Sequence, residues 1–155
     1  MVTDFFGTLL QELAQALHLP SLQPDANNSC ILKFKGEVIV QIEIDRSNQS
    51  LVIGSDLGSI PAGRYRENIF TEALKANGMP LPRYGIFAYS KQSDHLVIFD
   101  ALPIRDLTGT KVADFLPLFV QKARIWKTAL ERGDIPPLAT LYTAGQTSGI
   151  FGLKP

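Results

Sequence analysis

The sequence predicts an α+β protein in which one antiparallel sheet packs against helices, in the order α-βββ-α-ββ-α. Three observations predict this fold class. Apolar residues recur with the 3.6-residue period of a helix in three stretches of the chain. Between these stretches, apolar and polar residues alternate with the two-residue period of a strand. Short turns join consecutive strands, which favours antiparallel pairing in a single sheet.

The first helix is expected at about residues 3–17, because an apolar stripe runs through this segment. Pro20 ends the helix, and a loop rich in Pro, Asn and Asp follows at residues 21–29. The stripe is wider than a single contact seam needs, which indicates an additional contact for this helix. It comprises Phe5, Phe6, Leu9, Leu10, Leu13, Ala14 and Leu17.

Three strands are expected next, at about residues 30–35, 38–45 and 50–55. Tight turns after the first and second strands predict an antiparallel meander. The lone Cys30 stands on an alternating strand, where a cysteine is usually a small buried hydrophobe.

The second helix is expected to follow a loop at residues 54–63 and to end near Asn77. Ser59 is the expected N-cap, with Pro61 in the first turn. Gly78 is expected to end the helix in the left-handed conformation.

A second hairpin is expected at residues 84–90 and 95–101. Its first strand is apolar on both faces, and such a strand normally has both faces covered. Ile86 and Ala88 lie on one face, and Phe87 and Tyr89 on the other.

The last helix is expected at about residues 110–132. If Thr110 is its cap, Pro117 falls inside the helix and kinks it, whereas a cap at Asp114 places Pro117 in the first turn. One kinked helix is the preferred interpretation. Residues 1–132 then form a single domain, and the Gly/Pro-rich residues 133–155 form a C-terminal tail that is flexible or strap-like.

The composition excludes several classes of protein. Lys plus Arg and Asp plus Glu each number 15, so there is no basic excess for binding nucleic acid. No apolar stretch approaches the roughly 20 residues of a membrane helix. The N-terminus lacks the cationic start of a signal peptide, and one cysteine allows no internal disulfide. These features predict a cytoplasmic protein that does not insert into membranes.

Glycines at 54, 58 and 63, with Arg64 and Arg66 nearby, would suit a phosphate loop before a helix. Their spacing matches no established nucleotide motif, so a simple strand-to-helix connection is the preferred interpretation. The segment Gly109-Thr110-Lys111 is a still weaker candidate for phosphate binding.

Catalytic candidates are equally sparse. Cys30 with His95 as its base would be a nucleophile pair, but a buried structural cysteine is favoured. Glu43 and Asp45 share one face of a strand, where a solvated face is favoured over acid–base chemistry. Neither histidine, His18 or His95, has metal-ligand neighbours at a suitable spacing. No catalytic residue, metal or cofactor is therefore predicted, and the chain is predicted not to be an enzyme.

The apolar surplus in the first helix and the second hairpin indicates a polypeptide partner. The order of elements resembles the class I type III secretion chaperones of the Tir-chaperone (CesT-like) family over residues 1–132. Similar local patterns are the leucine-rich opening helix, residues 30–40 of the meander, the segment Leu96 to Pro103, and the apolar spacing of the closing helix from Phe115 to Leu130.

This resemblance implies a bacterial, cytoplasmic homodimer that binds the extended N-terminal segment of secreted effector proteins and keeps them competent for export without nucleotide. Contact with the secretion ATPase is left open. The cargo-binding residues that it implies are Phe6, Leu10, Leu13, Leu17, Ile31, Ile39 and Val52. The dimer-interface residues that it implies are Tyr65, Ile69, Ala73, Ile86, Phe87 and Tyr89.

Two features depart from the family pattern. Members are typically acidic, whereas this chain is neutral, and its tail is longer than the pattern requires. One hypothesis is that the tail covers an apolar groove when cargo is absent. Two other functions remain as alternatives: a non-enzymatic adaptor that binds a folded partner, and a nucleotide binder using residues 54–63.

Overall fold

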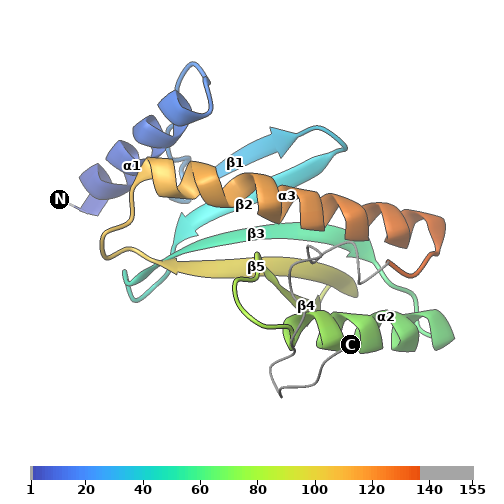
Figure 1. Ribbon diagram of the computed structural model, residues 1–155. Coiled ribbons are helices and arrows are strands. Elements are labelled where there is room, and N and C mark those ends of the chain that lie inside the picture. Colours follow the sequence, from blue (N-terminus) through green and yellow to red (C-terminus); the bar gives the residue numbers. More distant parts are fainter. Residues whose placement is uncertain (1, 137–155) are drawn as a thin grey trace.

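The computed structural model describes residues 2–136, and these fold in the order that the sequence predicts (Figure 1). The predicted tail therefore lies almost wholly outside the described residues, and the domain boundary at residue 132 stays a prediction. The elements are α1 (Val2–Ala16), β1 (Ser29–Phe34), β2 (Val38–Ile44), β3 (Ser50–Ser59), α2 (Arg64–Asn77), β4 (Ile86–Ser90), β5 (His95–Pro103) and α3 (Gly109–Arg132).

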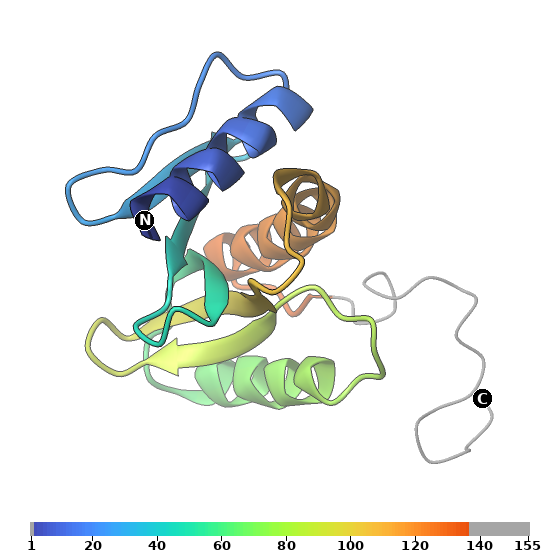
Figure 2. The ribbon, with the colours of Figure 1, turned by 90° about the vertical axis from the view of Figure 1, so that its left-hand side faces the viewer.

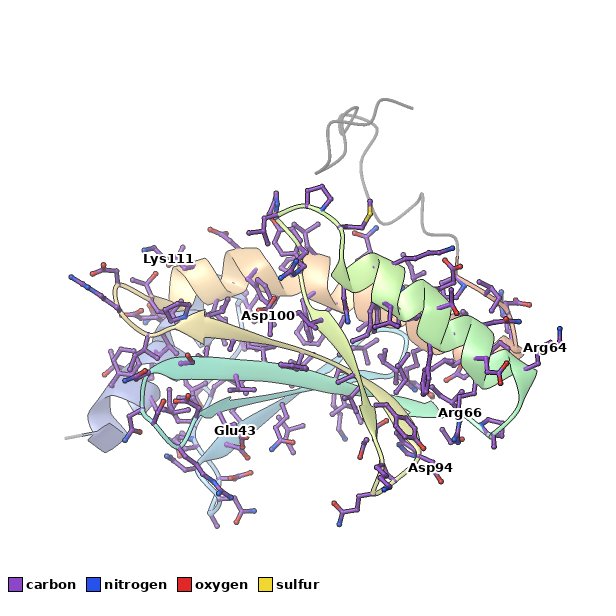
Figure 3. All side chains as sticks on the ribbon, turned by 90° about the horizontal axis from the view of Figure 1, so that it is seen from below. Glu43, Arg64, Arg66, Asp94, Asp100 and Lys111 are labelled. Atoms are coloured by element: carbon purple, nitrogen blue, oxygen red, sulfur yellow. The ribbon has the colours of Figure 1, made fainter. Side chains whose placement is uncertain are left out.

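The strands form one antiparallel sheet in the order β1-β2-β3-β5-β4 within the described chain. The long helix α3 runs along one face of the sheet, α1 lies beside α3 near β1, and α2 lies beside β4 (Figures 1 and 2). Figure 3, seen from below, shows α2 and α3 together on one side of the sheet. No described helix covers the other face, which we call the open face.

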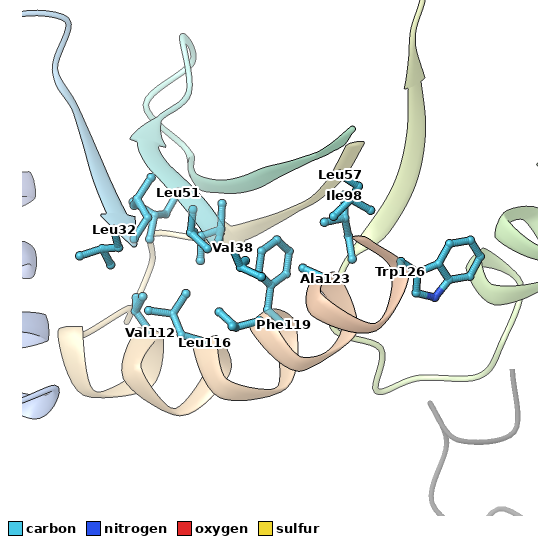
Figure 4. Packing of buried hydrophobic residues seen from close by; sticks show 14 of the residues in the cluster. Leu32, Val38, Leu51, Leu57, Ile98, Val112, Leu116, Phe119, Ala123 and Trp126 are labelled. Carbon is cyan, nitrogen blue, oxygen red and sulfur yellow. The ribbon is translucent and has the colours of Figure 1, made fainter. Parts of the chain in front are cut away.

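The core lies between α3 and the covered face of the sheet (Figure 4). The apolar stripe of α3 repeats at helical spacing, and its members are fully buried. Alternate residues of the strands supply the opposite wall. The α3 stripe comprises Val112, Leu116, Phe119, Ala123 and Trp126, and the opposite wall includes Leu32, Val38, Leu51, Leu57 and Ile98.

α1 packs closely against the start of α3. A Cβ atom on Gly109 would lie 2.4 Å from the backbone nitrogen of Leu13, so only glycine allows this approach. The backbone N–H of Gly109 donates a hydrogen bond to Glu12 Oε2 at 2.8 Å. Because this carboxylate occupies the N-terminus of α3, the segment beginning at Gly109 has no free anion site.

α3 is a single helix with Pro117 inside it, which confirms this part of the preferred interpretation, while the kink at Pro117 stays a prediction. Its N-cap is Thr108 rather than Thr110 or Asp114. Thr108 has the extended backbone that a cap requires, and its hydroxyl accepts a hydrogen bond from the Lys111 N–H at 3.2 Å.

The expectation of a loop at residues 54–63 is wrong for the first half of this segment. β3 continues to Ser59 and pairs with β5, with a bulge between Asp56 and Gly58. Ser59 pairs with His95 in the sheet and therefore does not cap a helix. α2 begins only at Arg64, after Gly63. Two glycines and an aspartate made this segment resemble a loop, whereas the buried Leu57 and Ile60 anchor it to the core.

One further expectation needs correction. Gly78 ends α2 with φ −86°, in the right-handed region, so the expected left-handed stop is wrong. Within the described chain only Phe87 of β4 is buried, so coverage of both faces of this strand stays a prediction. The Phe87 ring lies 4.1 Å from that of Trp126, measured between centroids, while Ile86, Ala88 and Tyr89 remain half-exposed.

Two charged side chains, Lys122 and Asp100, bind the backbone of Gly85, which directly precedes β4. Lys122, with only 6% of its surface exposed, donates to the carbonyl oxygen of Gly85 at 2.9 Å. Asp100 Oδ2 accepts from the Gly85 N–H at 2.9 Å. Burial lowers the pKa of Lys122 to about 8, while Asp100 acts in the opposite direction and Arg83 adds to the lowering. Burying the charged ammonium group of Lys122 therefore costs part of its solvation free energy.

We predict that this lysine makes stability depend on pH in the alkaline range. Between pH 8 and the ordinary lysine pKa of 10.5, the unfolded chain binds more protons than the folded chain. The free energy of unfolding of the native chain should therefore rise, relative to that of Lys122→Met, by up to about 1.4 kcal/mol per pH unit. Urea denaturation of both proteins across this range measures the difference, and a constant difference would contradict the lowered pKa.

Candidate binding surface on the open face of the sheet

The open face carries apolar side chains that no described helix covers. Ile31 on β1 and Ile39 on β2 are 54% and 49% exposed, and Phe99 on β5 is also exposed. They point away from the core because alternate residues of a strand face opposite sides of the sheet. Isolated exposed apolar residues are ordinary, but these belong to one continuous surface.

The strand register aligns the open-face residues in three rows across the sheet. The middle row consists of Ile31, Gln41, Gly54, Phe99 and Ile86. The row on one side consists of Ser29, Glu43, Val52 and Ala101. On the other side, Lys33 pairs with Ile39, and Asp56 pairs with Val97, which pairs with Ala88.

The parts of these rows on β1, β2, β3 and β5 line an open groove of about 550 Å³. Its apolar lining comes from four strands, so it crosses most of the sheet. Three carboxylates and one ammonium group stand around the apolar part, which gives the groove an acidic character. The groove is lined by Ile31, Glu37, Ile39, Gln41, Glu43, Val52, Gly54, Ser55, Asp56, Val97, Ile98, Phe99 and Lys127.

The charged groups of the groove differ in their local partners. Asp56 lies 2.8 Å from His95 Nδ1 and accepts from the Gly58 N–H at 2.9 Å. Glu43 has only a 3.5 Å contact from Gln41 Nε2. Lys127 Nζ lies 3.3 Å from Glu131, which offsets its positive charge. Glu43 points to the open face, away from the helices (Figure 3). It is therefore well placed to receive a cation from outside.

Side chains cap both edges of the sheet. At the β4 edge, the Asn77 side chain donates to the Phe87 carbonyl oxygen at 3.0 Å and accepts from the Phe87 N–H at 2.8 Å. At the β1 edge, the Asp25 carboxylate accepts from the Ser29 N–H at 3.0 Å, and this bond lowers the pKa of Asp25.

Backbone groups of alternate residues point to the same side of a strand, so Ile31 and Lys33 share the outward direction of Ser29. The β1 edge beyond Ser29 is thus available for strand pairing, directly beside the groove.

The structure divides the implied cargo-binding residues into two groups. Ile31, Ile39 and Val52 line the groove together. Phe6, Leu10 and Leu13 are fully buried, and Leu17 is half-buried against the core. The broad stripe of α1 is therefore used by packing within the chain, and only the strand residues lie on a surface. Sequence reasoning did not select Phe99 and Val97, although both alternate with buried residues on β5.

The implied dimer-interface residues are divided in a similar way. Ile69, Ala73 and Phe87 are buried, and the hydroxyl of Tyr65 donates to the Asp134 carbonyl oxygen at 2.7 Å. Ile86 and Tyr89 are half-exposed. A second hollow of about 180 Å³ lies between α2 and β4, and Leu74 beside it is 71% exposed. The hollow is lined by Phe70, Ala73, Leu74, Asn77, Phe87, Ala88, Tyr89 and Leu96.

The catalytic and nucleotide alternatives gain no support from the geometry. Cys30 is buried, burial raises the pKa of its thiol, and the sheet order puts β1 three strands away from His95 on β5. Residues 54–59 are strand, and Arg66 donates to the carbonyl oxygen of Ile60. Within residues 2–136, no three His, Cys, Asp or Glu side chains are grouped so as to hold a metal ion.

The described helices include none with the length and hydropathy needed to span a membrane.

Comparison with solved structures places the fold among known complexes. The chain is similar to a chain of the HopA1–SchA chaperone–effector complex, with 16% identity, 82% of this chain and 96% of that chain covered, and a TM-score of 0.62. It is similar to a chain of the ExsC–ExsE complex, with 19% identity, coverage of 83% and 95%, and a TM-score of 0.63.

A third similar chain comes from the Yersinia pestis type III secretion chaperone SycH in complex with a stable fragment of YscM2. That similarity has 21% identity, coverage of 76% and 96%, and a TM-score of 0.58. At these identities the likeness establishes the fold alone. A comparison with curated protein sequences gives no match.

Membership of a family rests on the sequence itself. The model of the Tir chaperone protein (CesT) family matches residues 8–127, which run from the middle of α1 through every strand and α2 to most of α3. The match agrees with the order of helices and strands and with the structural neighbours. The chain therefore belongs to the Tir chaperone protein (CesT) family.

Proposed function

We propose that this chain is a secretion chaperone that binds the N-terminal region of a type III effector protein and keeps it competent for export. The observation that carries the proposal is the open-face groove in a chain of this family. An uncovered apolar groove beside an available strand edge suits an extended polypeptide, because the backbone pairs with the edge while side chains enter the groove. The complexes of structural neighbours with effectors or partner fragments support the same function.

Binding on this surface requires neither nucleotide nor metal, and the proposed action involves no chemical reaction. The groove offers apolar contact and fixed carboxylates rather than a nucleophile beside a base. The buried Cys30 and the hydrogen-bonded Arg66 support a non-catalytic role for these side chains. The bacterial cytoplasm, where effectors await export, is the proposed location.

The chain also acts as a homodimer in this proposal, through the α2–β4 hollow and the exposed Leu74. The hollow has an apolar lining and shares no lining residue with the groove, which allows self-association and effector binding at the same time. The Asn77 side chain already forms hydrogen bonds with the backbone N–H and C=O of Phe87. At this residue the two copies therefore pack through side chains rather than by pairing β4 with β4.

We predict that Ile39→Asp weakens the binding of an effector segment at least about tenfold, because a carboxylate replaces apolar contact in an already acidic groove. Ile39 is half-exposed, so the melting temperature should change little. Fluorescence anisotropy with the isolated N-terminal segment of a type III effector from the same genome measures the affinity.

Leu118→Asp is the matched control, since Leu118 is 43% exposed on α3 and outside the groove. Equal losses in both variants would contradict the proposed surface. If the effector binds equally well after its N-terminal segment is removed, the chain is an adaptor for a folded partner instead.

We predict that Leu74→Asp converts the dimer to a monomer, because it places a charge in the centre of the proposed apolar contact. Light scattering coupled to size-exclusion chromatography measures the mass of the native chain, Leu74→Asp and Leu118→Asp at micromolar concentration. The native chain and Leu118→Asp should have twice the mass of Leu74→Asp. A monomeric native chain would refute the dimer.

A further inference from the structure

Gly54 occupies the centre of the open face, yet the fold does not require a glycine there. It lies inside β3 and pairs with Gln41 on one side and Phe99 on the other. A Cβ atom on Gly54 would lie 3.7 Å from the Ile98 carbonyl oxygen and 3.8 Å from Phe99 Cβ, which are ordinary contacts. Its backbone is also outside the positive-φ region that favours glycine. Alanine would therefore fit without displacing any atom.

Four other described glycines contrast with this one. A side chain on Gly85 would collide with Ile98 at 2.7 Å, and one on Gly109 would collide with α1 at 2.4 Å. Gly58 and Gly63 have φ of 113° and 138°, which other residues rarely adopt. These glycines are explained by folding, whereas Gly54 is not.

A glycine inside a strand weakens the fold, because it loses more conformational entropy on folding and contributes no side-chain packing. Such a glycine commonly marks a place where another molecule approaches the backbone closely. No atom of the Phe99 ring comes within 4 Å of the position of the missing Cβ, so the ring does not fill the space. The result is a depression in the groove floor between Gln41 and Phe99.

Two carboxylates flank this depression. Glu43 lies two residues beyond Gln41 along β2, diagonally across from Gly54, and Asp56 lies two residues beyond Gly54 along β3. Glu43, as a diagonal cross-strand neighbour, is about 7–8 Å from Gly54, within reach of a long cationic side chain. Asp56 stands on the opposite side of Gly54 and already lies 2.8 Å from His95 Nδ1. The single lysine of the groove lining, Lys127, is paired with Glu131. The surroundings of the depression thus favour a cation.

Building on the effector-binding function, we propose that Gly54 is a specificity-determining position of the groove. The space above it receives one large apolar side chain of the bound segment, and Glu43 selects a lysine or arginine beside that side chain. The partner is therefore an effector segment in which a bulky apolar residue neighbours a basic residue. An acidic segment of equal hydropathy is rejected by charge repulsion.

The test combines stability with binding in the full-length chain. Gly54→Ala should raise the melting temperature by about 1–4 °C, because a compatible alanine reduces the entropy of the unfolded chain. The same variant should bind partners about tenfold more weakly, because the added methyl group fills the space that the partner side chain needs. Gly78→Ala is the matched control, since its Cβ also fits and it lies outside the groove.

Two probes are used. The first is a short capped peptide of alternating leucine and lysine, with a twin in which glutamate replaces lysine. Methyl NMR titration up to about 1 mM should show saturable shifts at Val52 and Val97 with the lysine peptide only. Glu43→Gln should weaken this binding. The second probe is the effector segment that the native chain binds.

Each outcome decides the proposal. The proposal is established if Gly54→Ala is more stable and binds more weakly than the native chain, while Gly78→Ala binds as the native chain does. Lower stability in Gly54→Ala would show that the fold needs the glycine, and unchanged binding would show that the space is not used; either refutes it. Equal shifts with both peptides, or none with either, refute the selection of a cation. Effector binding that is indifferent to Gly54→Ala refutes this inference alone, whereas peptide binding without any effector binding refutes the proposed function alone.

Discussion

The packing of α3 along one face of the sheet is the contact on which the rest of the structure depends. Val112, Leu116, Phe119, Ala123 and Trp126 bury one apolar stripe against alternate residues of the strands. α1 then packs beside α3, and α2 packs at β4 near Trp126 (Figure 4). All three helices pack on one side of the sheet, so no described helix covers the apolar residues of the other face. The open face thus follows from how the core is built.

Stability and recognition make opposite demands on this open face. A strand interior is normally strengthened by β-branched or aromatic side chains, yet β3 has Gly54 at its centre. On the covered face the same strand has large apolar side chains instead: Leu51, Ile53 and Leu57 are fully buried. One strand therefore serves packing on one face and contact with other molecules on the opposite face. The two-residue period of a strand lets these roles be separated residue by residue.

Periodicity in the sequence located every helix and strand of the described chain, because the apolar stripes of α1 and α3 and the alternation in β2 are strong. It could not tell which apolar residues face inward and which remain exposed. Phe6, Leu10 and Leu13 were assigned to a cargo surface, but they are fully buried in the core, where α1 packs against α3. Turn-forming residues at 54–63 concealed the end of β3, since the bulge at Asp56 and Gly58 requires the same residue types as a loop. The groove depends on cross-strand register, which no local pattern contains.

The side chains that close the sheet edges have a further consequence for a chain with no net charge. An exposed edge invites pairing with other sheets, and charge repulsion does not prevent it here. Asn77 engages the backbone of Phe87 on β4, and Asp25 engages that of Ser29 on β1, so each edge is interrupted at one residue. A strand that extends either edge must pair beyond this interruption, which shortens the stretch over which two sheets can join. The fold therefore limits edge-to-edge association by hydrogen bonds near the starts of its two outer strands rather than by charge.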